Sequence, residues 1–262
     1  MCFDTDSVPP FFAEAGRPTM PVDAAPVTLK SADGTSFAAF LARPERPSGA
    51  GVIVLPDFRG LFRFYELLAQ RLAEQGHTAL AIDYFGRTAG IGPRGEDFPF
   101  REHLMRVTRQ GVDDDMAAAA DYLRGPDGGK CKAVMALGFC FGGRQAFFAS
   151  AAKFGLAGVI GFYGAPSFYP NGAVGPTQRA AELSAPILGL FGGADHGIPP
   201  SDVAAFNDAL KAAGVEHEIE VYPGAPHSFF DVKYAEHGEA CADAWRRVLR
   251  FIEEHLRVGS AA

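Results

Sequence analysis

Short apolar runs alternate with longer amphipathic segments along most of the chain, and this alternation predicts the secondary structure. Each apolar run has the length of a strand buried on both faces, and each amphipathic segment has helical spacing. The predicted strands cover residues 27–30, 37–43, 51–55, 78–82, 133–137, 158–162, 186–191 and 216–222. The predicted helices cover residues 65–75, 102–123, 143–154, 201–213 and 236–256. Such alternation favours an α/β fold with three layers around a mostly parallel sheet.

Turn-forming residues mark the limits of these elements and of the domain. Asp33-Gly34 is a hairpin signal between the first two strands, and Ser201 is expected to cap the helix that stops at Gly214. Residues 1–24 place prolines and a glycine between short apolar pieces, so we expect an irregular N-terminal arm. Residues 25–262 are expected to form a single domain. The acidic run 113–115 is expected to lie on the surface of its helix.

Composition and charge narrow the class of protein. The chain has 262 residues, 48% of them hydrophobic, which is enough for one large core. No run of about 18 apolar residues occurs, so a membrane-spanning helix is not expected. The 24 Lys and Arg residues against 31 Asp and Glu residues give a net charge of −7 without a basic cluster. We therefore expect neither nucleic acid nor a membrane as a partner.

The cysteines suggest a reducing compartment. Cys2, Cys131, Cys140 and Cys241 do not have the spacing of a metal motif, and four cysteines are few for a disulfide framework in a chain of this size. The N-terminus is acidic and lacks an apolar stretch, so no signal peptide is readable. We expect a cytoplasmic protein that needs no metal ion and no other cofactor.

The strongest chemical signal is the sequence Gly-Phe-Cys-Phe-Gly-Gly at residues 138–143, between a predicted strand and a predicted helix. It is the cysteine version of the nucleophile elbow, in which small neighbours permit a sharp, strained turn. A helix N-terminus behind Cys140 favours its thiolate, and the N–H of Phe141 would face a developing oxyanion. The alternative is a buried cysteine in a glycine-rich turn.

An acid and a histidine follow two later strands. Asp195 comes just after the strand 186–191, and His227 comes just after the strand 216–222. The order Cys140, Asp195, His227 is the order nucleophile, acid, histidine of α/β-hydrolases. Each residue alone has an ordinary alternative: Asp195 could cap a turn, and His227 could be a loop histidine. Three loops in the right order favour a catalytic triad.

These residues resemble the dienelactone hydrolase family, whose members are α/β-hydrolases with a cysteine nucleophile. The resemblance covers about residues 26–256 and rests on residues 138–143, on Asp195 with Pro199, and on residues 227–229. It implies a compact sheet of about eight strands without a large lid domain. It also implies hydrolysis of an ester or lactone through a thioester on Cys140, with His227 as general base and acid and Asp195 orienting it.

The resemblance extends to residues that would serve the triad or the substrate. It implies a thiol-activating acid at Asp57, where the family usually has Glu, and a second oxyanion donor at the N–H of Phe58. The alternative is that Asp57 has a structural role only and caps the following turn. An arginine that binds a substrate carboxylate falls at Arg87, for which a solvated loop position is the alternative. A second such arginine falls at Asp231, where an acid would repel a carboxylate, and Arg59 or Arg144 could replace it.

Phenylalanine accounts for 23 of the 31 aromatic residues, which suggests a dry, aromatic environment. Many of these residues lie on the loops that should converge at the site: Phe58, Phe62, Phe64, Phe85, Phe139, Phe141, Phe229 and Phe230. We expect a cleft walled by Phe, with Phe85 and Phe139 among the groups that bind substrate; ordinary core packing beneath the loops is the alternative.

The sequence therefore predicts an esterase or lactonase that acts on a small-molecule ester or lactone through a cysteine. A non-catalytic binding or redox-sensing protein on the same scaffold is the competing hypothesis. An intact acid and histidine favour the enzyme, because a thiol sensor needs neither.

Overall fold

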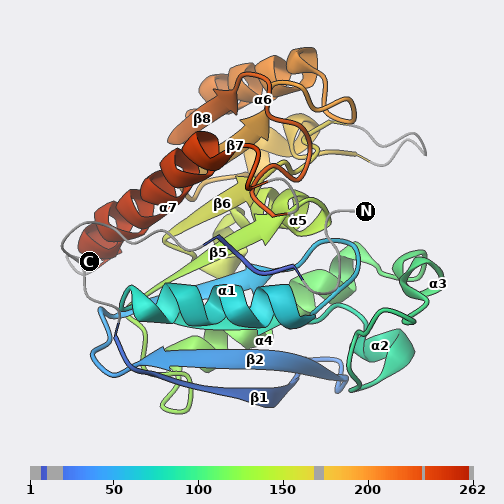
Figure 1. Ribbon diagram of the computed structural model, residues 1–262, viewed down its shortest axis with the longest axis vertical. Helices are drawn as coiled ribbons and strands as arrows, with labels where there is room; N and C mark the ends of the chain where they lie inside the picture. Colours follow the sequence, from blue (N-terminus) through green and yellow to red (C-terminus); the bar gives the residue numbers. More distant parts are fainter. Residues whose placement is uncertain (1–6, 11–19, 168–173, 232–233, 260–262) are drawn as a thin grey trace.

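A computed structural model describes residues 7–10, 20–167, 174–231 and 234–259 (Figure 1). The strands are β1 (Val22–Lys30), β2 (Ser36–Pro44), β3 (Ala50–Leu55), β4 (Thr78–Ile82), β5 (Ala133–Phe139), β6 (Gly158–Phe162), β7 (Ile187–Gly192) and β8 (His217–Tyr222). The α-helices are α1 (Arg63–Glu74), α2 (Gly86–Ala89), α3 (Phe100–Leu104), α4 (Arg109–Arg124), α5 (Phe141–Ala149), α6 (Pro200–Ala213) and α7 (Gly238–Gly259). Two short 3-10 helices are η1 (Ala152–Phe154) and η2 (Thr177–Glu182).

One sheet of eight strands forms the centre of the fold, in the order β1-β2-β4-β3-β5-β6-β7-β8. The first two pairings are antiparallel and all others are parallel. Every residue of β3, β4, β5, β6 and β7 is buried, as the continuous apolar runs predicted. The predicted α/β fold with a mostly parallel sheet is confirmed.

Helices cover both faces of the sheet, which explains why its central strands are apolar throughout. Figure 1 shows α1 and α7 in front of the sheet and α4 behind it. On β6, a Cβ at Gly158 would meet Phe251 of α7, whereas a Cβ at Gly161 would meet Phe147 of α5. These two glycines lie on opposite faces of the strand, so α7 and α5 pack on opposite sides of it.

The N-terminal part of the sheet begins earlier than the sequence predicted. Strand β1 starts at Val22, which pairs with Pro44, so three residues of the expected arm 1–24 belong to the sheet. The described residues Pro9 and Pro10 are buried. Residues 1–6 and 11–19 of the arm lie outside the described residues.

Two predicted helices are broken, each by a polar side chain. The segment 102–123 splits into α3 and α4, because the Thr108 side chain accepts a hydrogen bond from the Gly111 N–H at 3.1 Å and starts a new helix. The segment 143–154 splits into α5 and η1. There the Ser150 carbonyl accepts from the N–H groups of Ser184 and Ala185, and its hydroxyl donates to Ala185. In α6 the first helical residue is Pro200, so the expected cap at Ser201 is wrong.

The parallel strands end at one edge of the sheet, and this edge carries the chemistry-bearing loops. The register pairs Leu55 with Gly138 and Gly138 with Gly161, so β3, β5 and β6 stop level with one another. The loops after β3, β5, β6, β7 and β8 hold Asp57, Cys140, Tyr163, Asp195 and His227. Within the described part of the chain, no helix is long and apolar enough to cross a membrane.

Candidate active site

Cys140 lies in a sharp turn between β5 and α5. Its backbone has φ 53° and ψ −111°, a conformation that costs a non-glycine residue free energy and persists only where the surroundings impose it. The Cys140 N–H donates to the Phe162 carbonyl at 3.0 Å, which ties the turn to the end of β6. The side chain is half-buried, in contrast to Cys131 and Cys241, which are buried. The predicted elbow geometry is present.

The glycines around Cys140 are required by the close approach of the backbone. A Cβ at Gly138 would stand 2.0 Å from the Gly142 carbonyl oxygen, and a Cβ at Gly142 would stand 2.1 Å from the carbonyl oxygen of Leu55. Neither position has room for a side chain. The first turn of α5 therefore packs directly against the loop that follows β3, and this contact brings Phe58 and Cys140 to the same end of the sheet.

Asp195 holds His227 by a short hydrogen bond. The distance from His227 Nδ1 to Asp195 Oδ2 is 2.6 Å, and the other carboxylate oxygen accepts from the Gly197 N–H at 2.8 Å. The Asp195 side chain is 2% exposed and that of His227 is 34% exposed. A buried carboxylate on Nδ1 favours the tautomer that carries its proton there, which leaves Nε2 to act as a base.

The end of β6 contacts both Cys140 and His227. Phe162 accepts the Cys140 N–H, and the next residue, Tyr163, lies with its ring centroid 4.9 Å from that of His227. Cys140 and His227 thus lie against two consecutive residues. Two loops 87 residues apart in the chain (227 minus 140) thus meet at the end of β6, and a triad of Cys140, Asp195 and His227 stays a prediction.

Tyr163 also binds Asp231, and the sequence analysis did not find this pair. The fully buried Tyr163 hydroxyl donates to Asp231 Oδ2 at 2.8 Å, and Asp231 is 2% exposed. Asp231 stands where the resemblance would have a carboxylate-binding arginine, yet here it packs internally under the His227 loop. The sequence feature that could have indicated Tyr163 as a site residue is its position directly after a strand of the parallel sheet.

Two backbone N–H groups match the predicted oxyanion hole. Phe141 is the first residue of α5, and Phe58 lies in the loop after β3. Among the described residues, neither N–H donates to a protein acceptor. Because Gly142 packs against the Leu55 carbonyl, the two groups belong to loops in direct contact. Two unsatisfied donors beside a nucleophile can stabilise the negative oxygen of a tetrahedral intermediate.

Asp57 is fully buried, and its contacts include those of a turn cap. Its Oδ1 accepts from the Arg59 N–H at 2.8 Å, while its own N–H donates to the Tyr65 hydroxyl at 2.9 Å. Tyr84 lies close by and donates to the Pro56 carbonyl at 2.8 Å. Burial, with further contributions from the charges of Asp57, Asp83 and Cys140, raises the Tyr84 pKa well above its ordinary value. Tyr84 therefore remains a neutral phenol.

Arg87 is occupied by two carboxylates of the protein. Its Nη1 donates to both oxygens of Asp115, at 2.8 and 2.7 Å, and its Nε donates to Asp33 at 2.8 Å. Asp115 is fully buried and also accepts from the Ser31 hydroxyl. The expectation that residues 113–115 lie on the surface is therefore wrong for Asp113 and Asp115. The contacts of Arg87 are those of a structural ion pair and leave no bidentate face for a substrate carboxylate.

The other candidate arginines also have protein partners. Arg144 is 2% exposed and donates to the carbonyl oxygens of Ala165, Ser167 and Val174, at 2.6 to 2.9 Å. It therefore holds the segment after β6 in place. Arg59 is 9% exposed and lies 4.9 Å from the ring centroid of Phe62.

Most of the Phe residues near the site belong to the core. Phe85 and Phe139, which we expected to bind substrate, are at most 1% exposed; Phe139 stacks on Phe162 with ring centroids 4.7 Å apart. Five others are buried as well: Phe62, Phe64, Phe229, Phe230 and Phe162. Only Phe58 and Phe141, which supply the candidate oxyanion donors, are half-buried. The wall of Phe is thus mainly core packing beneath the loops.

Comparison with known proteins places this geometry in a family. Residues 37–256 match the dienelactone hydrolase family. The chain is 30% identical over 239 residues to a protein of Yersinia pestis named "Putative carboxymethylenebutenolidase", with 87% of each chain covered. A protein of Saccharolobus solfataricus with the same name is 30% identical over 259 residues, which cover 84% of this chain and 95% of the relative.

Solved structures agree with the fold. A crystal structure from Klebsiella pneumoniae, titled as that of a "Putative Dienelactone Hydrolase", superposes with a TM-score of 0.77 at 30% identity and covers 89% of this chain and 99% of that one. A dienelactone hydrolase-like promiscuous phosphotriesterase from metagenomic libraries superposes with a TM-score of 0.68 at 22% identity, covering 88% and 98%. At that identity the second likeness concerns the fold alone.

Proposed function

The chain belongs to the dienelactone hydrolase family and is an ester or lactone hydrolase, and from this premise we propose that it works through a thioester on Cys140. The observation that carries the proposal is the strained backbone of Cys140 at the N-terminus of α5, tied to Phe162, together with a His227 imidazole that Asp195 holds at 2.6 Å and that lies against the next residue, Tyr163. A thiol sensor has no need of a histidine oriented by a buried acid.

In the proposed first half-reaction, His227 Nε2 takes the proton of the Cys140 thiol, and the thiolate sulfur attacks the carbonyl carbon of the substrate. The carbonyl π electrons move to the oxygen, which the N–H groups of Phe58 and Phe141 stabilise. The oxyanion then re-forms the carbonyl and expels the alkoxide, which takes the proton from the imidazolium. The products of this step are an alcohol, or the ring-opened hydroxyl of a lactone, and a thioester on Cys140.

In the second half-reaction, His227 takes a proton from water as the water oxygen attacks the thioester carbonyl. The tetrahedral intermediate uses the same two N–H donors. It collapses with release of the Cys140 sulfur, which regains a proton from the imidazolium, and the carboxylic acid leaves. Asp195 does not accept a proton in either half-reaction and stabilises the imidazolium by its negative charge.

We further propose that the acyl group of the substrate is uncharged. Arg87 is bound by Asp33 and Asp115, Arg144 is bound by three carbonyl oxygens, and Asp231 is an acid at the position where a second arginine would bind a carboxylate. A substrate carboxylate would have to displace one of these pairs. A simple ester or an uncharged lactone makes no such demand.

The test is turnover of p-nitrophenyl acetate by the wild-type chain and by two variants. We expect a stoichiometric burst of nitrophenol from the wild type, because acylation frees the alcohol before the thioester is hydrolysed. Cys140→Ala should abolish turnover, and His227→Ala should lower it by about a hundredfold or more, the scale of general-base loss. Cys131→Ala, a change at a buried thiol outside the site, is the matched control and should keep the burst. Unchanged turnover in Cys140→Ala would overturn the proposal.

A further inference from the structure

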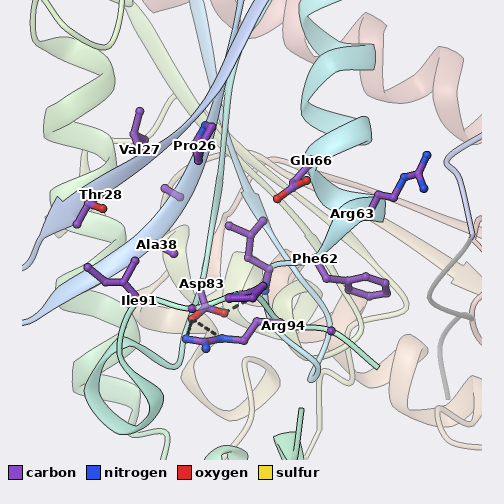
Figure 2. A pocket seen from close by; sticks show the side chains of 15 residues that line it. Pro26, Val27, Thr28, Ala38, Phe62, Arg63, Glu66, Asp83, Ile91 and Arg94 are labelled. Atoms are coloured by element: carbon purple, nitrogen blue, oxygen red, sulfur yellow. Dashed lines mark hydrogen bonds and ion pairs between the residues drawn. The ribbon is translucent and has the colours of Figure 1, made fainter. Parts of the chain in front are cut away.

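A cavity lies away from the Cys140 loops, between the β1–β2 hairpin and the start of α1 (Figure 2). Its volume is about 690 Å³, which is in the range of sites for small molecules. Its walls come from β1, β2, residues 61–66, Asp83 and residues 91–95. Cys140, Asp195, His227, Phe58 and Phe141 are not among its lining residues. The proposed hydrolytic site therefore does not account for this cavity.

Most of the cavity wall is apolar. Val27 and Ala38 contribute from the hairpin, Leu61 from the loop after β3, and Ile91, with 55% of its surface exposed, from the segment 91–95. Ala38 is small, so a larger side chain at this position of β2 would reduce the space. A wall of this kind suits the carbon skeleton of a ligand.

One acidic group projects into this apolar space. Glu66 is half-buried in the first turn of α1, and Figure 2 shows its carboxyl group pointing into the cavity while the Arg63 side chain extends away from it. No hydrogen bond or ion pair reaches the Glu66 carboxylate from the described residues. Burial raises the Glu66 pKa, and the charge of Arg63 offsets this only in part. A half-buried carboxylate without a hydrogen-bond partner in the protein gains stability when a cation or donor joins it.

The basic group on the other side of the cavity is neutralised within the protein. The buried Arg94 donates through Nε and Nη2 to Asp83 Oδ2, at 3.2 and 2.8 Å, and through Nη2 to the Gly90 carbonyl. Asp83 also accepts the N–H groups of Leu61 and Phe85. Arg94 Nη1 lies 3.7 Å from where a Cβ of Gly92 would stand, beside the cavity, and none of the described acceptors takes its hydrogens. It can donate to a ligand oxygen without supplying a net charge.

We propose that this cavity binds a small primary amine with an apolar body and an acceptor oxygen. Its ammonium group pairs with Glu66, its carbon skeleton packs on Val27, Ala38, Leu61 and Ile91, and its oxygen accepts a hydrogen bond from Arg94. A carboxylic acid fits less well, because its charge would face Glu66 while that of Arg94 is already balanced by Asp83. An uncharged analogue would leave the Glu66 carboxylate without its counter-charge.

The probe is para-methoxyphenethylamine, an arylalkylamine with one ether oxygen, titrated into the full-length chain by calorimetry. We expect one site outside the Cys140 loops, and an affinity at least about tenfold above that of the matched alcohol, the difference that one partly buried ion pair supplies. Affinity should rise with pH as Glu66 loses its proton and fall again where the amine becomes neutral. Alkylation of Cys140 with iodoacetamide should leave the binding unchanged.

Three variants complete the test. Glu66→Gln keeps the shape of the side chain and should weaken amine binding about tenfold without affecting the matched alcohol. Glu74→Gln on the same helix, where Glu74 pairs with Arg71 outside the cavity, should bind as the wild type does. Ala38→Phe should fill the cavity and abolish binding. Equal affinity of the wild type and Glu66→Gln, loss of binding on Cys140 alkylation, or no binding at all would each overturn the proposal; the first of these does not depend on how Ala38→Phe folds.

Discussion

At the scale of single residues, three of the four described non-glycine residues with positive φ lie around the proposed triad, and the fourth is Lys130, in the loop before β5. Cys140, Tyr163 and Ser228 have φ of 53°, 38° and 60°, in the left-handed region that non-glycine residues rarely adopt. Each is a member of the triad or touches His227 in sequence or in space. Such conformations cost about 1–3 kcal/mol each and persist where packing imposes them. Here the hydrogen bond from Tyr163 to Asp231 is part of that packing, and we expect Tyr163 to act as a positioning residue for His227.

Tyr163→Phe should therefore lower kcat about tenfold with little change in KM, because a loss of about 1.4 kcal/mol in positioning affects the transition state more than substrate binding. The double variant Tyr163→Phe with Asp231→Asn should recover part of the loss, since it no longer buries a carboxylate next to an apolar ring. Steady-state kinetics measures both effects.

The matched control for this prediction is Tyr222→Phe. The Tyr222 hydroxyl also donates to an aspartate, Asp243, at 3.0 Å, but this pair joins the last residue of β8 to α7. A purely structural role for Tyr163 would lower thermal stability in both variants and leave kcat alone. An unchanged kcat in Tyr163→Phe would show that the ring alone positions His227.

At the scale of elements, the sequence predicted the central strands well and the helix ends less well. A run such as 51–55 is apolar because both faces of its strand are covered, so its identity is local information. The breaks after Leu104 and Ala149 depend on Thr108 and on the partners of Ser150 more than thirty residues away. The Thr108 cap is local, but the spacing of apolar residues does not reveal it, and the distant partners of Ser150 are not encoded in the local pattern at all.

The candidate site shows the same division. Cys140, Asp195 and His227 were predictable because each follows a strand of a parallel sheet, where loops converge. The partners of Arg87 were not, because Asp33 and Asp115 reach it from a hairpin turn and from α4. The burial of Phe85 and Phe139 likewise depends on tertiary partners, such as Phe98 for Phe85 and Phe162 for Phe139.

Arg87 joins the β1–β2 turn to α4, and removing it should destabilise this contact. Arg87→Gln leaves the buried Asp115 without its cation, so the free energy of unfolding should fall by about 3 kcal/mol, as for a broken buried ion pair. Urea denaturation measures this. Activity toward a carboxylated ester and an uncharged ester should change by the same factor. Arg250→Gln, at an exposed pair with Glu218, is the control and should leave stability nearly unchanged. A selective loss of activity toward the carboxylated ester would instead show that Arg87 binds the substrate carboxylate.

At the scale of the whole molecule, the three described thiols differ in their expected reactivity as nucleophiles. Burial raises the pKa of Cys131, and burial with the nearby charge of Asp231 raises the pKa of Cys241 to about 12. A raised thiol pKa lowers the fraction of thiolate at neutral pH, so these two groups are weak nucleophiles. Cys140 is the half-buried thiol at a helix N-terminus, on the edge of the sheet where Asp195 and His227 converge. Of the three described thiols, Cys140 is therefore the one that suits the proposed thioester.

The most direct test of the account is the mass of the acylated chain. After rapid mixing with p-nitrophenyl acetate and quenching in acid, we expect one acetyl group per chain, mapped by peptide digestion to Cys140 and removed by neutral hydroxylamine, as a thioester is. In His227→Ala the adduct should accumulate if the Cys140 thiol is still acylated without the base, because hydrolysis of the thioester is then slowed. In Cys140→Ala the adduct should be absent. An acetyl group on another residue, or turnover in wild type without any adduct on Cys140, would contradict the proposed thioester mechanism.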